Sequence, residues 1–276
     1  MALHCMVQTG MDSTMQVAGQ RLEVQWLRPA QVRRAQTLVF LHEGLGSVAL
    51  WRGWPQAVCE ALGCVGLVYS RRGYGRSEPV PDVRGPAREH EGQRIGRLRP
   101  DYMHHEALTV LPALLAAAQV REPVLVGHSD GGTIALLHAA QHPVAGCAVM
   151  APHIMVEPIS LAAIAQAREA FVHGPLRARL APFHDDVDGA FWQWNDVWLS
   201  DGFRSFDIRG VLAQIHAPLL AIQGEQDPYG TMAQIDGIAL AAPHTRRVKL
   251  QDCGHSPQRD QPAAVLAALS DWLATV

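Results

Sequence analysis

Short apolar runs alternate along the chain with longer segments in which apolar residues recur every three or four positions. The runs cover residues 38–41, 65–70, 123–129, 145–152, 218–224 and, more weakly, 247–253. The longer segments cover residues 54–63, 104–119, 131–143 and 261–276. The runs have the length of buried strands, and the longer segments have the period of helices. This alternation predicts an α/β fold, in which helices flank a mainly parallel sheet.

One region breaks the alternation. Between about residues 153 and 206 the sequence has no strand candidate, only helical patches at 160–174 and 185–203. Some fifty residues are too many for a loop inside a compact domain. We therefore expect a helical cap at 153–206, inserted into a core domain made of residues 1–152 and 207–276.

Composition and charge narrow the classes of protein. Of the 276 residues, 48% are hydrophobic and 18% charged, and the net charge of -3 gives no general attraction for nucleic acid. No stretch approaches the ~20 apolar residues of a membrane helix. The chain start lacks the basic and apolar segments of a secretory signal, and the five cysteines lack metal-like spacing. We expect a cytoplasmic protein with reduced thiols and no nucleic-acid or membrane partner.

The residues around Ser129 predict a nucleophile. The stretch VLVGHSDGGTIAL (124–136) has the pattern Gly-x-Ser-x-Gly between a predicted strand and a predicted helix. Such a turn strains the backbone of its central residue, and a side chain at either glycine would collide with the neighbouring strand or helix. The turn holds the Ser129 hydroxyl at the strand's carboxyl end, near the positive end of the following helix.

A serine hydroxyl needs a base beside it, and two residues further along suit that task. Asp227 follows a buried strand in a Gly-Glu-Gln-Asp turn, and His255 lies in a Gly-His-Ser-Pro loop before the last helix. The carboxyl ends of parallel strands meet at one edge of a sheet. We predict that Asp227 orients His255, which takes the proton from Ser129. Three other acids compete with Asp227: Glu225, Asp252 and Glu157.

Five motifs in order make the chain resemble the α/β-hydrolase superfamily from about Leu22 to the C-terminus. They are HEGLGS, SRRGYGRSEP, GHSDGG, GEQDP and GHSP. The resemblance implies an α/β-hydrolase fold with an eight-stranded, mostly parallel sheet and a helical cap after the sixth strand. It places the first two strands within the N-terminal fifty residues. Arg72, in the second motif, is expected to be a buried ion-pair partner rather than a substrate clamp.

The resemblance also implies an oxyanion hole made of two backbone N–H groups. Asp130 would supply one, and Gly44 or Leu45, in the loop after the third strand, the other. That loop usually begins His-Gly, but here it begins His42-Glu43. A carboxylate aimed at the oxyanion would oppose its charge, so we expect Glu43 to point away and brace the turn. Ordering water, recognising substrate, or a metal site shared with Asp130 are the alternatives.

Several side chains are candidates for the substrate pocket: Glu43, His128, His153, Phe191, Trp192, Trp194 and Trp198. The four aromatic residues of the cap equally suit a core of the cap's own. The arginine-rich segment 71–99 is either a solvated surface or a site for the phosphates of coenzyme A.

Together these features predict a serine hydrolase without metal or organic cofactor, acting on an ester or related acyl bond of a small to medium, partly apolar molecule. A serine at the elbow argues against the dehalogenases and epoxide hydrolases of the superfamily, which use an aspartate there. Hydrolysis of thioesters, lactones or carbon–carbon bonds and perhydrolase activity stay open. So do a cofactor-free lyase or oxygenase and a non-catalytic ligand-binding protein. The oligomeric state is not predicted.

Overall fold

The computed structural model describes residues 12–276. Almost all of the N-terminal segment, in which no secretory signal was expected, lies outside this range. Eight strands form one sheet in the order β1-β2-β4-β3-β7-β8-β9-β10. Their bounds are β1 Asp12–Val17, β2 Gln20–Leu27, β3 Thr37–Leu41, β4 Val65–Tyr69, β7 Val124–His128, β8 Gly146–Met150, β9 Leu219–Gly224 and β10 Arg246–Leu250. Strands β1, β2 and β4 pair antiparallel in turn, and β4, β3 and β7–β10 pair parallel. All six apolar runs are strands, so the predicted sheet is confirmed.

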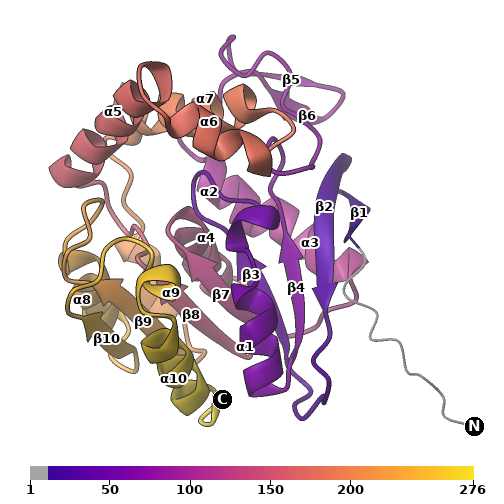
Figure 1. The fold of residues 1–276 in the computed structure, drawn as a ribbon, viewed down its shortest axis with the longest axis vertical. Coiled ribbons are helices and arrows are strands. Elements are labelled where there is room, and N and C mark those ends of the chain that lie inside the picture. Colours follow the sequence, from indigo (N-terminus) through magenta and orange to yellow (C-terminus); the bar gives the residue numbers. More distant parts are fainter. Residues whose placement is uncertain (1–11) are drawn as a thin grey trace, which may run out of the picture.

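Helices cover both faces of the sheet (Figure 1). Helix α1 (Trp54–Leu62) and helix α10 (Pro262–Leu273) pack their apolar residues on one face, next to the short α9 (Pro257–Asp260). Helix α4 (Asp130–Ala139) and helix α8 (Ala233–Ala241) pack on the other face. The sheet is therefore buried between two apolar cores, as expected for strands that are almost continuously hydrophobic.

The helix predicted at 104–119 is interrupted. It consists of α2 (Tyr102–His105), a π-helical turn η2 (Glu106–Val110) and α3 (Leu111–Ala117). Pro112 has no N–H to donate to the preceding turn, which gives a physical reason for the irregularity. Single π-helical turns within helices are often found beside functional sites.

The segment between β8 and β9 is helical and lies over the carboxyl ends of the parallel strands (Figure 1). It contains α5 (Pro158–Val172), α6 (Leu176–Leu180) and α7 (Val187–Trp198). We call these three helices the cap; its treatment as a separate domain stays a prediction. Shorter 3₁₀ turns are η1 Ala49–Trp51, η3 Ala181–Phe183, η4 Asp201–Phe203 and η5 Arg209–Gln214.

The arginine-rich segment contains a small hairpin that the sequence pattern did not predict. Strands β5 (Arg88–His90) and β6 (Gln93–Ile95) pair antiparallel, separate from the main sheet. Figure 1 shows the hairpin at the same end of the molecule as the cap.

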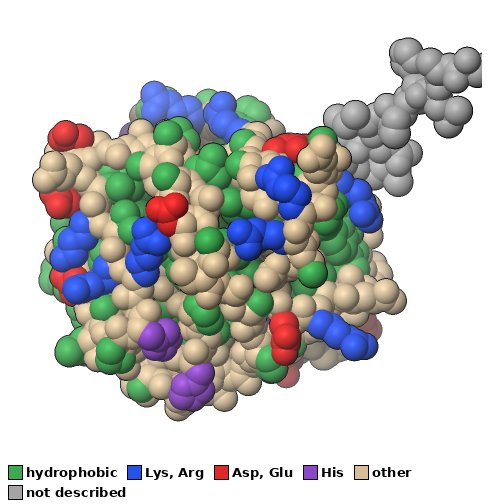
Figure 2. Space-filling view, turned by 90° about the horizontal axis from the view of Figure 1, so that it is seen from below, with side chains coloured by type: hydrophobic (Ala, Val, Ile, Leu, Met, Phe, Trp, Pro, Cys, Tyr) green, Lys and Arg blue, Asp and Glu red, His purple; other side chains and the backbone are tan. Residues whose placement is uncertain are grey.

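On the surface opposite the cap, neither positively nor negatively charged side chains dominate (Figure 2). Figure 2 shows basic and acidic side chains interspersed among apolar ones on this face. Within residues 12–276, no helix is long and apolar enough to cross a membrane.

Candidate active site

Ser129 occupies a strained turn between β7 and α4. Its backbone angles are φ 53° and ψ -121°, outside the regions that most residues adopt. A Cβ added to Gly127 would lie 2.6 Å from the Cα of Gly132, and one added to Gly131 would lie 2.6 Å from the carbonyl oxygen of His42. The strain and the need for glycine were both predicted, and the close approach of the backbone explains them.

Ser129, His255 and Asp227 form one chain of hydrogen bonds. The Ser129 Oγ lies 3.0 Å from His255 Nε2, and His255 Nδ1 lies 2.9 Å from each carboxylate oxygen of Asp227. Asp227 also accepts a hydrogen bond from the backbone N–H of Tyr229 at 2.8 Å. Because Nδ1 donates to the carboxylate, Nε2 can accept the serine proton. The fold thus brings together the three residues that the motifs singled out.

Asp227 is ionised in this setting. Burial alone would raise its pKa, but the hydrogen bond and charge of His255 outweigh burial and hold the pKa below its usual value. The carboxylate can therefore stabilise a positive charge on His255. Three other acids form no hydrogen bond or ion pair with His255 within residues 12–276: Glu225, Asp252 and Glu157.

Arg71 holds the loop after β3 in place. Its buried guanidinium donates to the carbonyl oxygens of His42, at 2.5 Å, and Glu43, at 2.9 Å. The backbone N–H of Arg71 also donates to His42 Nε2, at 3.0 Å. Burial, aided by the positive charge of Arg71, lowers the pKa of His42 well below its usual value, so this imidazole is neutral. The loop is fixed through its main chain.

Helix α7 and the segment that precedes it touch this loop at the two residues expected to shape the oxyanion hole. A side chain at Gly44 would collide with the indole of Trp194. The carbonyl oxygen of Leu45 lies 3.0 Å from His184 Nε2. Across the site, the N–H of Asp130 belongs to the first turn of α4, where N–H groups have no acceptor within the helix. The oxyanion hole of Asp130 with Gly44 or Leu45 stays a prediction.

The Glu43 carboxylate turns back onto its own loop. A Cβ added to Gly46 would lie 2.6 Å from Glu43 Oε2, which is 3.5 Å from His128 Nδ1. Burial alone would raise the pKa of Glu43, but the contact with His128 outweighs it, and the pKa falls to about 2. This orientation fits the bracing role, with His128 as the side-chain partner.

The side chain of Asp130 has other partners. It accepts a hydrogen bond from the Tyr102 hydroxyl at 2.5 Å, and that hydroxyl accepts one from Trp198 Nε1 at 3.0 Å. Burial raises the pKa of Asp130, and the positive charge of Arg71 opposes this effect. Glu43 and Asp130 therefore do not share a site, and no three potential metal ligands converge anywhere in residues 12–276.

Two histidines adjoin the ring of His255. His128 lies with its ring centroid 5.2 Å from that ring, and its Nε2 is 2.7 Å from the carbonyl oxygen of His255. His153 lies at 5.8 Å and packs edge-on against Trp198. Burial lowers the pKa of His153 to about 3, so its imidazole is neutral. Its Nδ1 is buried and has no hydrogen-bond partner within the described chain.

The four aromatic candidates of the cap separate into two pairs. Trp194 and Trp198 reach the site, through the Gly44 and His153 contacts described above. Phe191 instead stacks on Phe171 inside the cap, with ring centroids 3.7 Å apart. Trp192 packs edge-on against the same two phenylalanines. Phe191 and Trp192 therefore stabilise the cap, and only the other pair can line a pocket at Ser129.

Three residues that position the site were not predicted. Arg71, Tyr102 and His184 each contact a loop or helix far from them in the chain. Arg71 could have been suspected from the second motif, where it precedes Arg72. The prediction for Arg72 is confirmed, because it forms a largely buried ion pair with Glu78 at 2.8 Å.

Comparisons with known proteins agree with this architecture. Residues 38–269 match the sequence profile described as Alpha/beta hydrolase family. No curated protein matches the sequence. The enol-lactonase from Burkholderia xenovorans is 18% identical, with a TM-score of 0.70 over 95% of this chain and 100% of the other. Proline iminopeptidase from Mycobacterium smegmatis is 17% identical, with a TM-score of 0.72 over 96% of this chain and 98% of the other.

A putative aryl esterase from Burkholderia cenocepacia is also similar, with 21% identity and a TM-score of 0.69 over 96% of this chain and 98% of the other. At such identities the likeness concerns the fold. The family profile, however, spans most of the chain, including Ser129, Asp227 and His255. The chain therefore belongs to the α/β-hydrolase family.

Proposed function

We propose that the protein is a serine hydrolase that cleaves a carboxylic ester, through an acyl-enzyme, in a small to medium, partly apolar molecule. The observation that carries this proposal is the hydrogen-bonded chain of Ser129, His255 and Asp227, with distances of 3.0 and 2.9 Å. It lies at the carboxyl edge of the sheet, beside a loop and a helix start that can offer N–H groups to an oxyanion.

In this mechanism His255 accepts the Ser129 proton while Oγ attacks the carbonyl carbon. The N–H of Asp130 and that of Gly44 or Leu45 stabilise the negative charge on the carbonyl oxygen; losing one such donor typically costs about 3 kcal/mol. His255 then protonates the leaving alcohol. In the second half it activates a water molecule, which releases the acid and restores Ser129.

The surroundings of Ser129 support a compact substrate with apolar groups. Ser129 is only 5% exposed, and Trp194 and Trp198 of the cap lie over the site. These rings suit an acyl or aryl group. The unpartnered Nδ1 of His153 suits one polar group of the substrate, because a buried polar atom without a partner is costly.

The test is hydrolysis of p-nitrophenyl esters with acyl chains from C2 to C12 by the parent protein and by Ser129→Ala. We expect turnover that favours the shorter chains and is lost in the folded variant. Turnover of a thioester or lactone without any ester turnover would contradict the ester proposal while keeping the same nucleophile. Ester turnover that survives in Ser129→Ala would exclude Ser129 as the nucleophile.

A further inference from the structure

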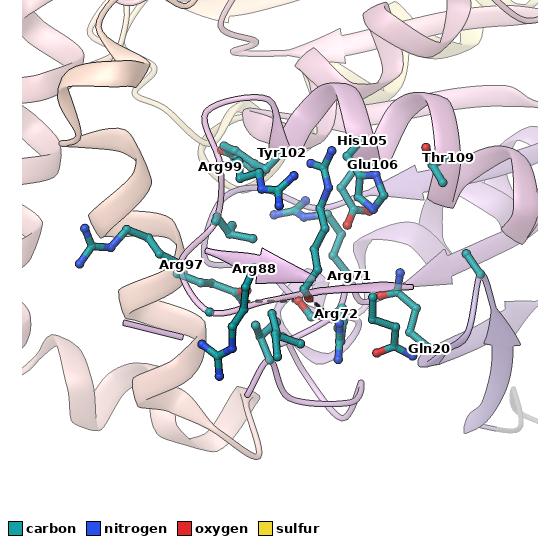
Figure 3. A pocket seen from close by; sticks show the side chains of 18 of the residues that line it. Gln20, Arg71, Arg72, Arg88, Arg97, Arg99, Tyr102, His105, Glu106 and Thr109 are labelled. Carbon is teal, nitrogen blue, oxygen red and sulfur yellow. Dashed lines mark hydrogen bonds between the residues drawn. The ribbon is translucent and has the colours of Figure 1, made fainter. Parts of the chain in front are cut away.

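A cavity lies between the β5–β6 hairpin and the π-helical turn η2 (Figure 3). It is small, with a volume of about 110 Å³. Its lining includes Arg71 and Tyr102, which hold the oxyanion loop and Asp130, but neither Ser129 nor His255. The cavity is therefore a separate space that shares a wall with the proposed active site.

The lining contains an unusual concentration of unpaired polar atoms. Five of them are buried and have no hydrogen-bond partner within residues 12–276: Arg72 Nε, Tyr74 Oη, Glu106 Oε2, Gln20 Oε1 and Gln193 Oε1. Gln193 is only 1% exposed and Gln20 only 7%. Buried polar groups are nearly always paired, so these atoms indicate a polar occupant. The arginine N–H needs an acceptor on that occupant, and the two amide oxygens need a donor.

The charge of the lining indicates that the occupant is an anion. Arg71 is only 2% exposed, and its guanidinium donates to main-chain oxygens instead of to a carboxylate. Glu106 is the acid that lines the cavity, and burial raises its pKa to about 7, so it is only partly ionised at neutral pH. Arg72 is paired with Glu78, so the excess of positive charge in the interior comes from Arg71.

The lining contains four more arginines: Arg88, Arg94, Arg97 and Arg99. Acidic side chains neutralise three of them, and these ion pairs are Arg88–Asp82, Arg94–Asp101 and Arg99–Glu89. Arg97 forms no ion pair within residues 12–276, and its guanidinium donates to the backbone carbonyl of Arg84. Arg97 is thus available to a carboxylate, which a guanidinium can bind through two hydrogen bonds.

We propose that this cavity binds a small acid with two hydroxyl groups, whose carboxylate accepts from Arg97 and from Arg72 Nε, the nitrogen that the ion pair with Glu78 leaves free, and whose hydroxyl groups donate one each to the amide oxygens of Gln193 and Gln20. The proposal does not depend on ester hydrolysis. It assigns a ligand to a space that the proposed mechanism does not use.

Isothermal titration calorimetry with three matched compounds tests the proposal. Tartrate carries two carboxylates and two hydroxyl groups, succinate lacks the hydroxyl groups, and threitol lacks the charges. We expect saturable binding of tartrate, at least fivefold weaker binding of succinate, and no detectable binding of threitol. Equal affinity for tartrate and succinate would overturn the hydroxyl contacts, and absence of saturable tartrate binding would overturn the site.

Variants show whether binding occurs in this cavity. Arg97→Gln should weaken the binding of tartrate and of succinate alike, by fivefold or more. Gln193→Leu should weaken the binding of tartrate until its affinity approaches that of succinate. Arg121→Gln changes an exposed arginine that does not line the cavity and should leave all affinities unchanged. Arg97 is also exposed, so its replacement tests the site even if the Gln193 variant does not fold. Tartrate binding that survives Arg97→Gln unchanged would overturn the assignment.

Discussion

The Nε2 nitrogen of His128 lies 2.7 Å from the backbone carbonyl oxygen of His255. Because a carbonyl oxygen only accepts, Nε2 carries a proton, and Nδ1 faces Gln258 Nε2 at 3.1 Å and the Glu43 carboxylate at 3.5 Å. The histidine of the nucleophile turn thus connects the loop that contains Gly44 with the loop that contains His255. In this arrangement the unusual carboxylate after His42 braces both sides of the proposed site.

We expect the ionised Glu43 carboxylate to stabilise the folded protein at neutral pH but not at strongly acidic pH. Its carboxyl has a pKa of about 2 when folded and near 4.5 otherwise, so folding favours the ionised form. This contribution is complete above the unfolded value and disappears as the pH falls toward the folded one. Glu43→Gln should lower the free energy of unfolding at neutral pH, and the difference from the parent should shrink between about pH 4.5 and about 2. Urea unfolding across that range measures it, and a difference independent of pH would contradict the account.

Asp227→Asn should leave the fold intact but reduce kcat on a p-nitrophenyl ester by about 10⁴-fold, because His255 would lose the partner that fixes its tautomer. The measurement is the initial rate at saturating ester. Asp252→Asn and Glu225→Gln serve as matched controls on neighbouring acids and should retain nearly full activity. A comparable loss in either control would assign the third member of the triad to a different acid.

Gly44→Ala should push the oxyanion loop and the cap apart, because a Cβ there would collide with the indole of Trp194. Overpacking of this kind typically costs about 1–3 kcal/mol, so both the melting temperature and kcat should fall. Adding Trp194→Ala to Gly44→Ala should restore part of the lost melting temperature, because the smaller side chain makes room for the new Cβ. Gly53→Ala is the control, since nothing lies within 4 Å of the added Cβ. Additive effects of the two changes would rule out a direct contact.

Tyr102→Phe should destabilise the protein by about 1–3 kcal/mol, because the buried carboxyl of Asp130 would lose the hydroxyl that donates to it. Chemical denaturation at neutral pH gives the change in the free energy of unfolding. Tyr69→Phe is the matched control, since the buried Tyr69 hydroxyl has no hydrogen-bond partner in residues 12–276. Equal effects of the two substitutions would show that the bond to Asp130 contributes nothing.

The sheet and the proposed triad could be predicted because their signals are local. Each parallel strand is an apolar run, and Ser129, Asp227 and His255 each lie in a short motif next to such a run or before a helix. The hairpin of β5 and β6 was missed because its strands have three residues each and, apart from Ile95, charged or polar side chains. Its polar and apolar residues do not alternate over enough positions to indicate a strand.

The contacts that shape the site from outside the motifs could not be predicted. His184 reaches Leu45 across 139 positions, and Tyr102 reaches Asp130 from the helix with the π-helical turn. The cap aromatics show the same limit: Phe191 and Trp194 are three positions apart on α7, yet only Trp194 meets the oxyanion loop. Which residues meet there depends on how α7 packs against α5 and the core, which no local pattern encodes.

Labelling with a fluorophosphonate tests the central claim most directly, because the reagent forms a stable adduct only with an activated serine. We predict one adduct per folded chain by intact mass, located on Ser129 by peptide mapping. It should be absent from Ser129→Ala and from the unfolded protein, and formed at least a hundredfold more slowly in His255→Ala. An adduct on another residue, or a folded protein that is not labelled at all, would contradict the assignment of Ser129 as the nucleophile.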